Sequence, residues 1–185
     1  MIRYREVIGM PVFCSQKGKK LGIVGDVIVS LEERKVKAFE LEKKGFGVNS
    51  KGFLFESIEN LGTDAIILKN FFCLDFLNNL GVKKPFDKGT PFNRGVICGR
   101  KVYTKTGREL GVVKDYFFDP VTGRVEGIEL SDGIYEDIVQ RRNILPLFGK
   151  VEFGEDNVMV GREAVEEMMS TGGGIKRKFL RNHIL

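Results

Sequence analysis

Few side chains in this sequence could act as acids, bases or nucleophiles near neutral pH. The only histidine, His183, lies close to the C-terminus, so Ser-His pairs, Cys-His pairs and histidine-based metal sites are not supported. Cys14, Cys73 and Cys98 are isolated and odd in number, which indicates plain thiols rather than a disulfide framework or a zinc knuckle. No GxGxxG follows a strand, and no P-loop motif occurs. We therefore expect a protein that is not an enzyme and holds no cofactor.

Two groups of carboxylates are the remaining candidates for holding a metal ion. Neither group has the spacing of a calcium-binding loop, so we interpret both as solvated turns and expect no metal site. The groups are Asp132, Glu136 and Asp137, and Glu152, Glu155 and Asp156.

Basic residues interleaved with apolar residues end the chain, after a glycine hinge that begins at Gly172. Such a composition is typical of a segment that binds RNA, an anionic membrane surface or a protein groove, and also of one that only keeps a protein soluble. These alternatives stay open. The cations that would make the contact are Lys176, Arg177, Lys178 and Arg181.

An aromatic segment is the second candidate for partner binding, through Phe71, Phe72 and Phe76. The spacing of Phe72, Cys73, Phe76 and Leu77 predicts a short helix with one apolar stripe. If this stripe does not cover its own domain, it is the surface of the chain best suited to a partner.

The elements that position these residues occur twice in the chain. Residues 12–41 align with residues 102–130 with a one-residue gap, and the shared positions are glycines, apolar residues and one aspartate. A period of about 90 residues is too long for a solenoid unit and matches a whole small domain. The matched aspartates, Asp26 and Asp115, indicate a shared structural task, such as holding a turn through hydrogen bonds from side chain to backbone.

Each copy has the pattern of short strands followed by a helix. Glycines and β-branched residues alternate with polar turns, which predicts a small closed barrel with bent strands. The apolar faces of the matched strands predict four core residues, which are Phe39, Leu41, Ile128 and Leu130.

The second copy ends with a stripe of the same spacing as the stripe at Phe72, and a glycine follows each predicted helix. This second stripe consists of Ala164, Val165, Met168 and Met169. We therefore predict an all-β protein of two small barrels in tandem, each closed by a short C-terminal helix. The predicted boundaries are domain 1 at 1–81, a linker at 82–91, domain 2 at 92–171 and a flexible basic tail at 172–185.

The formal net charge of +5 is unevenly distributed. Residues 1–70 carry a small basic excess, residues 91–170 are net acidic, and the tail is basic, so a nucleic-acid footprint over the whole second domain is not supported. The N-terminus runs directly into charged residues, and no stretch approaches the roughly 18 apolar residues of a membrane span. We expect a cytoplasmic protein without a transmembrane segment.

Two short segments, Leu21–Val27 and Leu110–Asp115, each followed by a turn and a strand, resemble PRC-barrel domains. The second copy carries the fuller pattern, at residues 99–103, 119–125 and 142–147. PRC-barrels are small β-barrels found in the H subunit of photosynthetic reaction centres, in the C-terminal half of a ribosome maturation factor and in stand-alone proteins. The resemblance implies a protein-docking module without catalysis, and neither of the two named functions carries over residue by residue.

The leading hypothesis is therefore a non-catalytic adaptor that binds another protein. The alternative is an RNA- or ribosome-associated factor, in which the tail and the lysines of domain 1 contact phosphate; its binding would fall steeply with added salt. A metal- or ligand-binding barrel with enzymatic activity has little support. A homodimer stays open, because domains of roughly 80 residues bury only a small core.

Overall fold

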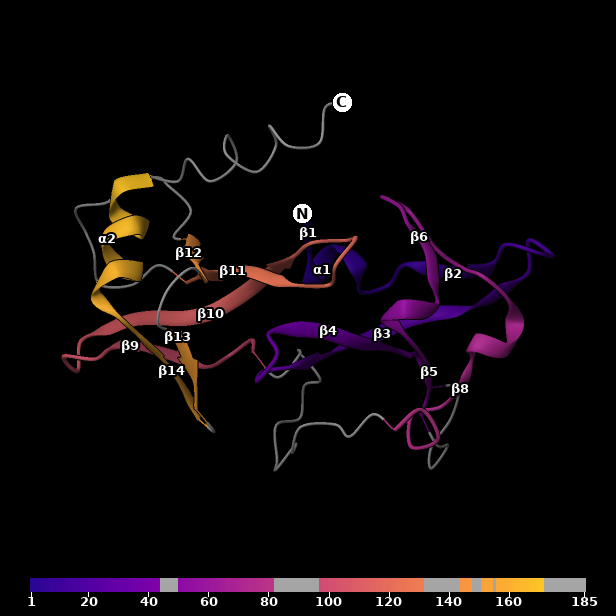
Figure 1. Ribbon diagram of the computed structural model, residues 1–185, viewed down its shortest axis with the longest axis horizontal. Helices are drawn as coiled ribbons and strands as arrows, with labels where there is room; N and C mark the ends of the chain where they lie inside the picture. The colour runs from indigo at the N-terminus through magenta and orange to yellow at the C-terminus, as the bar shows by residue number, and fades with distance from the viewer. Residues whose placement is uncertain (44–49, 82–96, 132–143, 148–150, 155, 172–185) are drawn as a thin grey trace. The chain divides into compact units, whose positions relative to one another are not determined.

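The computed structural model describes residues 1–43, 50–81, 97–131, 144–147, 151–154 and 156–171 (Figure 1). The predicted linker and tail therefore lie outside the described residues, and the predicted domain boundaries stay a prediction. The chain divides into two compact units, which are treated separately below. The N-terminal unit comprises Ile2–Val96 with Asp119–Arg124, and the C-terminal unit comprises Met1, Ile97–Phe118 and Val125–Leu185.

The N-terminal unit is built around a seven-stranded sheet with the order β6-β7-β2-β3-β4-β5-β8. Strands β2 and β7 are parallel, and the other neighbours are antiparallel. The elements are β1 (Ile2–Arg3), α1 (Tyr4–Val7), β2 (Pro11–Cys14), β3 (Lys20–Ser30), β4 (Lys35–Leu41), β5 (Lys51–Leu54), the 3₁₀ helix η1 (Phe55–Ser57), β6 (Ile58–Leu61), β7 (Ile66–Leu68), the 3₁₀ helix η2 (Phe71–Cys73) and β8 (Asp75–Phe76).

The C-terminal unit repeats this strand order as β13-β14-β9-β10-β11-β12, with β9 and β14 as its parallel pair. Since the order and the parallel pair both match, the predicted duplication extends to the topology of the sheet. The elements are β9 (Lys101–Thr104), β10 (Glu109–Phe118), β11 (Val125–Leu130), β12 (Ile144–Pro146), β13 (Val151–Phe153), β14 (Asn157–Val160) and α2 (Arg162–Thr171).

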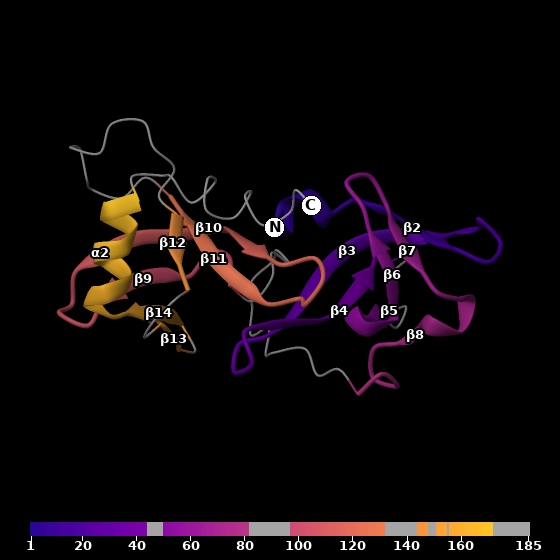
Figure 2. The ribbon, with the colours of Figure 1, turned by 45° about the horizontal axis from the view of Figure 1, so that its top comes forward.

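One long strand curls each sheet into a barrel-like form, as Figures 1 and 2 show for β3 and β10. The first part of β3 pairs with β2 and the second part with β4, and β10 divides its pairing between β9 and β11 in the same way. A β-bulge accompanies the change of partner in both strands, between Val24 and Asp26 and between Val113 and Asp115. Bulges increase the local twist, so the two halves of each sheet can face one another.

The matched aspartates lie at these bulges. Asp26 Oδ1 accepts a hydrogen bond from Val27 N at 2.7 Å, and Asp115 Oδ1 accepts one from Tyr116 N at 2.9 Å. The predicted structural task is therefore confirmed, although the aspartates hold a strand bulge rather than a turn. Gly25 is the bulged residue of the first copy, and a β-carbon there would lie only 3.1 Å from Glu42 N.

The four core residues predicted from the matched strands are buried. Phe39 and Ile128 have no exposed surface, and Leu130 and Leu41 are 3% and 7% exposed. Helix α2 occupies the predicted place after the last strand of the second copy and packs against β12. Ala164, the first residue of its stripe, is fully buried. No helix in the described ranges has the length and apolar character needed to cross a membrane.

The predicted closing helix of the first copy is not an α-helix. Its residues form the single turn of η2 and the two-residue strand β8, followed by a turn that ends at Gly81 with a φ of 68°. Asp75 supplies a physical reason, because its Oδ1 accepts hydrogen bonds from Phe76 N at 2.7 Å and Asn79 Nδ2 at 2.9 Å. Such local bonds from an aspartate compete with the helical backbone pattern, and aromatic residues are weak helix formers.

Candidate partner-binding surface

Segment 71–81 is fixed to its barrel through β8 and Leu77. Strand β8 pairs with β5, with Phe76 opposite Lys51 and Asp75 opposite Gly52, and Leu77 N donates to Ser50 O at 3.0 Å. The Leu77 side chain is 3% exposed and packs in a core cluster with Ile28 and Ala38 of the two central strands. The predicted apolar stripe is thus divided, since Leu77 points into the core while the phenylalanines do not.

Gly52 makes the space that Leu77 occupies. A β-carbon at this position would lie 2.5 Å from Leu77 Cδ2 and would also collide with the carbonyl oxygen of Phe39. Only glycine fits between these two neighbours without a shift of the segment, so this residue positions the whole aromatic turn.

The phenylalanines of this segment are the most exposed aromatic side chains in the described ranges. Phe72 is 90% exposed and Phe71 is 55% exposed, and their rings form an edge-to-face pair with centroids 6.2 Å apart and planes at 72°. Phe76 is 36% exposed, and Lys51 Nζ lies 5.3 Å from its ring centroid in a cation–π contact. Of the predicted aromatic residues, the structure therefore pairs Phe71 with Phe72 and places Phe76 beside a lysine.

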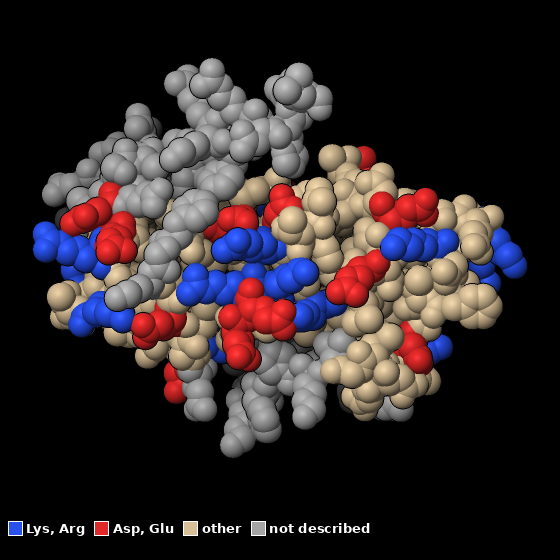
Figure 3. Space-filling model, viewed as in Figure 1, with Lys and Arg blue, Asp and Glu red and all other residues tan. Residues whose placement is uncertain are grey.

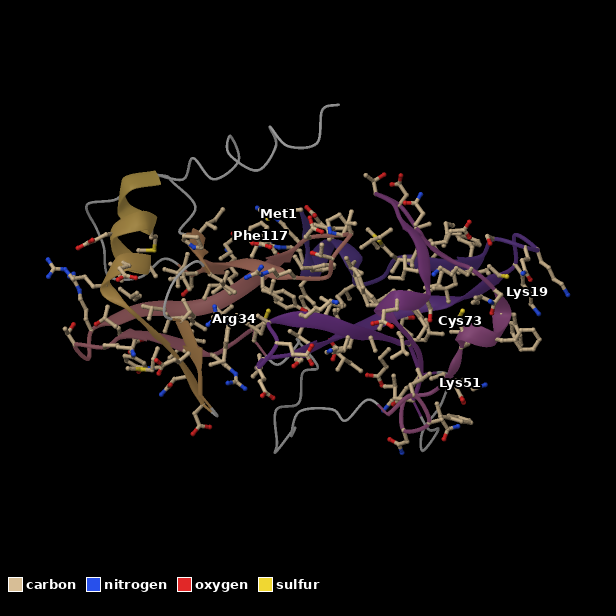
Figure 4. The ribbon with its side chains drawn as sticks, in the orientation of Figure 1. Met1, Lys19, Arg34, Lys51, Cys73 and Phe117 are labelled. Atoms are coloured by element: carbon tan, nitrogen blue, oxygen red, sulfur yellow. The ribbon has the colours of Figure 1, made fainter. Side chains whose placement is uncertain are left out.

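Lysines lie at the same end of the N-terminal unit as the aromatic pair. The turn between β2 and β3 is held against the end of β7, because Ser15 N donates to Leu68 O at 3.0 Å and Ser15 Oγ to Lys69 O at 3.1 Å. This turn carries Lys17 and Lys19, and both of these lysines and Lys69 are exposed. Figures 1 and 2 show the turn and η2 at one end of the unit, and Figure 4 places Lys19 near Cys73 there. The space-filling view shows basic side chains on this end, with acidic side chains beside them (Figure 3).

Sequence reasoning named the phenylalanines, but it considered the lysines of domain 1 only as a group and did not place any of them beside the aromatic residues. Lys17 and Lys19 lie more than 50 positions before Phe72 in the sequence, and only the parallel pairing of β2 with β7 brings their turn beside residues 68 and 69. One signal in the sequence could have identified them. The turn between the first two strands of copy one contains several lysines, whereas the matching turn of copy two contains fewer.

Buried carboxylates are a second feature that sequence reasoning did not assign. Glu40 is the cross-strand partner of Asp26, and Glu129 is the partner of Asp115. Asp115 is fully buried, and Glu40 and Glu129 are 3% and 7% exposed. Because both copies keep this pair, it belongs to the shared framework of the barrels. The sequence did contain a signal for this pair, because Glu40 and Glu129 occupy the same position in the two aligned copies.

The other predicted candidates are structural or lie outside the described residues. Within the described ranges, no group of three His, Cys, Asp or Glu side chains could hold a metal ion. Glu152 forms an ion pair with Lys105, with Oε1 and Nζ 2.7 Å apart. Cys14 is buried, and Cys73 and Cys98 are partly exposed. The candidates outside the described residues are Asp132, Glu136, Asp137, Glu155, Lys176, Arg177, Lys178, Arg181 and His183.

Arg100 and Asp119 show how charged side chains stabilise the ends of strands. Burial lowers the pKa of Arg100, and Asp156 partly opposes that shift, while the guanidinium donates to Gly154 O in the turn between β13 and β14. Burial alone would raise the pKa of Asp119, but hydrogen bonds from Thr122 and Val121 hold this pKa below its ordinary value. Both arrangements hold turns next to strands.

Comparisons with known proteins agree with the fold. Curated proteins give no match to the chain. The model of the PRC-barrel domain family matches residues 1–71 and residues 93–162, which is one match for each copy and covers well over half of the chain. The strand order found twice in the structure and the two matches lead to the same conclusion: the chain belongs to the PRC-barrel domain family, with two copies of the domain in tandem.

Proposed function

We propose that this chain is a cytoplasmic, non-catalytic adaptor that binds another protein through the aromatic end of its N-terminal barrel. The single observation that carries the proposal is the exposure of Phe71 and Phe72, at 55% and 90%. The segment that bears the two rings is anchored by Leu77, which is buried in the core of the barrel. The rings themselves stay exposed, although they belong to the same short segment.

Such a pair is suited to binding, because its apolar surface is removed from water only when a partner covers it, and this burial stabilises the complex. Burying a phenylalanine side chain stabilises a complex by about 1.5–3 kcal/mol, and aromatic side chains are common among the residues that dominate binding. The pair is also presented by a defined backbone, since η2 and β8 are anchored to the sheet. A fixed surface loses less conformational entropy on binding than a loose one.

Affinity capture of the tagged chain from native extract tests the proposal. The wild type is compared with a F71S/F72S double variant, and each capture is repeated with ribonuclease and with residues 172–185 deleted. We expect a defined set of proteins that survives ribonuclease and is lost from the double variant. A matched control is V121S, which removes another exposed apolar side chain, 77% exposed, from the turn between β10 and β11.

One outcome would contradict the adaptor function, and another would contradict the assigned contact surface. If the captured proteins disappear on ribonuclease treatment or on deletion of the tail, the RNA- or ribosome-associated alternative replaces it. If capture is equal for the wild type and the double variant, the aromatic end is not the contact surface.

A further inference from the structure

We infer that the aromatic end binds an acidic peptide segment that also carries apolar side chains. We define the aromatic-lysine end as Phe71 and Phe72 together with Lys17, Lys19 and Lys69. This inference rests on the proposed adaptor function and names the chemistry of the partner.

The positive charge at this end is available to a partner. Within the described part of the chain, no carboxylate forms an ion pair with Lys17, Lys19 or Lys69, and the only hydrogen bond of Lys69 Nζ is to the backbone oxygen of Glu56 at 3.2 Å. Some lysines elsewhere in the described ranges are paired with carboxylates, as Lys37 is with Glu33 at 2.5 Å and Lys105 is with Glu152 at 2.7 Å. Charge complementarity therefore favours a partner with several carboxylates.

The aromatic pair requires that the partner also carry apolar side chains. Two adjacent rings set at 72° form an angled surface rather than a flat one, and aliphatic or aromatic side chains of a peptide can pack against both rings. Lysines beside an apolar centre are typical of a protein–protein interface, in which polar and charged groups form a rim around the buried residues.

The same geometry disfavours single-stranded RNA as the occupant. Successive bases stack in parallel on aromatic side chains, whereas the planes of Phe71 and Phe72 are far from parallel. Lys51 already lies over the ring of Phe76. The cations at this end are all lysines, without the arginine that gives bidentate contacts to phosphate.

Fluorescence anisotropy with labelled peptides of about 12 residues tests the partner chemistry on the full chain. Three probes share the same two phenylalanines and differ in their remaining residues. These residues are serine and glutamate in the glutamate probe, serine and lysine in the lysine probe, and serine alone in the serine probe. We expect the glutamate probe to bind about tenfold more tightly than the serine probe, and to weaken as salt is added.

Variants assign this binding to the proposed residues. We expect the affinity for the glutamate probe to fall in F71S/F72S and, separately, in K17S/K19S, and the preference for glutamate over serine to shrink in the lysine variant. The matched control is K114S, which removes an exposed lysine of β10 in the other unit and is expected to leave both affinities unchanged.

Several results would overturn the inference. They are equal affinity for the three probes, tighter binding of the lysine probe, or tighter binding of a single-stranded RNA or of anionic phospholipid vesicles that depends on the same residues. The proposed function is judged separately: if the probes show no preference for charge but capture still depends on Phe71 and Phe72, the adaptor function stands and the acidic partner does not.

Discussion

Asp26 and Asp115 each hold the backbone where a long strand changes its pairing partner. The hydrogen bond runs from the N–H of the next residue to the carboxylate of the aspartate, in both copies. The bulge interrupts the regular hydrogen bonding between the strands at that N–H. The carboxylate of the preceding aspartate then accepts the hydrogen bond in place of a backbone carbonyl. The repeated aspartate therefore reflects the geometry of the barrel and carries no sign of a reaction.

Replacing Asp115 with Ala tests this role. The loss of an acceptor for a buried N–H costs about 1–3 kcal/mol. We expect a decrease in the free energy of unfolding, measured with denaturant. Asp115→Asn keeps an acceptor oxygen, so we expect a smaller decrease in the free energy of unfolding. An alanine variant as stable as the wild type would contradict the structural role of Asp115.

Arg34 occupies the place that Gly123 has in the second copy, and both have positive φ, at 51° and 73°. A residue with a β-carbon in this conformation is strained by about 1 kcal/mol. We expect Arg34→Gly to raise the thermal midpoint, and Gly123→Ala, as the reverse change, to lower it. If Arg34→Gly lowers the midpoint, contacts of the arginine side chain outweigh the backbone strain.

At the scale of elements, the aromatic turn depends on one glycine of the neighbouring strand. Gly52→Ala would push Leu77 out of its place against Ile28 and Ala38, and overpacking of this kind costs about 1–3 kcal/mol. We expect faster proteolysis within 71–81 and weaker partner capture, although no phenylalanine is changed. Gly62→Ala is the control, because its added β-carbon would meet a single atom, Ala65 O, at a tight 3.3 Å, without the overlap that occurs at Gly52. Equal effects of the two variants would contradict the role of Gly52 in positioning Leu77.

The turn that joins β10 to β11 is stabilised by Asp119, whose Oδ1 accepts bonds from Val121 N, Thr122 N and Thr122 Oγ1. Burial opposes the charge of Asp119, but these bonds lower its pKa below the ordinary value of 3.8. A pKa that is lower in the folded state stabilises the fold above the unfolded-state value, and the contribution is lost as the pH falls through the folded-state pKa.

The pH dependence of this contribution can be measured against Asp119→Asn. We expect the wild type to melt higher than the variant at pH 6, with a constant difference down to about pH 5 and a decrease below about pH 4. Circular dichroism melts over this range would measure the difference. A difference that stays constant to pH 2, or grows as the pH falls, would contradict the role of the charge.

Sequence patterns predicted the strands better than the closing segments, for a physical reason. Phe39 and Leu41 recur at every second position on either side of Glu40, and the matched strand repeats this spacing around Glu129. This local pattern indicates a strand with one apolar face without reference to the rest of the chain. The stripe of Phe72, Phe76 and Leu77 has helical spacing, yet local bonds of Asp75 and pairing with β5 determine its structure. Lys17 and Lys19 reach the aromatic end only through strand pairing, which no local pattern encodes.

At the scale of the whole molecule, six strands of each unit are paired in the same sheet order, β6-β7-β2-β3-β4-β5 in one and β13-β14-β9-β10-β11-β12 in the other. Perturbing the core of one sheet should therefore loosen that sheet first. We expect hydrogen exchange of Gly52→Ala to rise in β3, β4, β5 and β8 and to stay near wild-type values in β9 to β14. Equal increases in both sets of strands would show that the two barrels unfold as one cooperative unit.

The contrast between the aromatic turn of the first copy and helix α2 of the second has an evolutionary consequence. After a gene duplication, one copy can maintain the shape while the other changes, and here the two copies keep their long bent strand but differ in the segment that follows the last strand of the barrel. In this chain, that segment takes two different structures next to the same order of strands. A protein engineer who wished to give such a barrel a new ligand would redesign this terminal segment and leave the bulged strand and its aspartate intact.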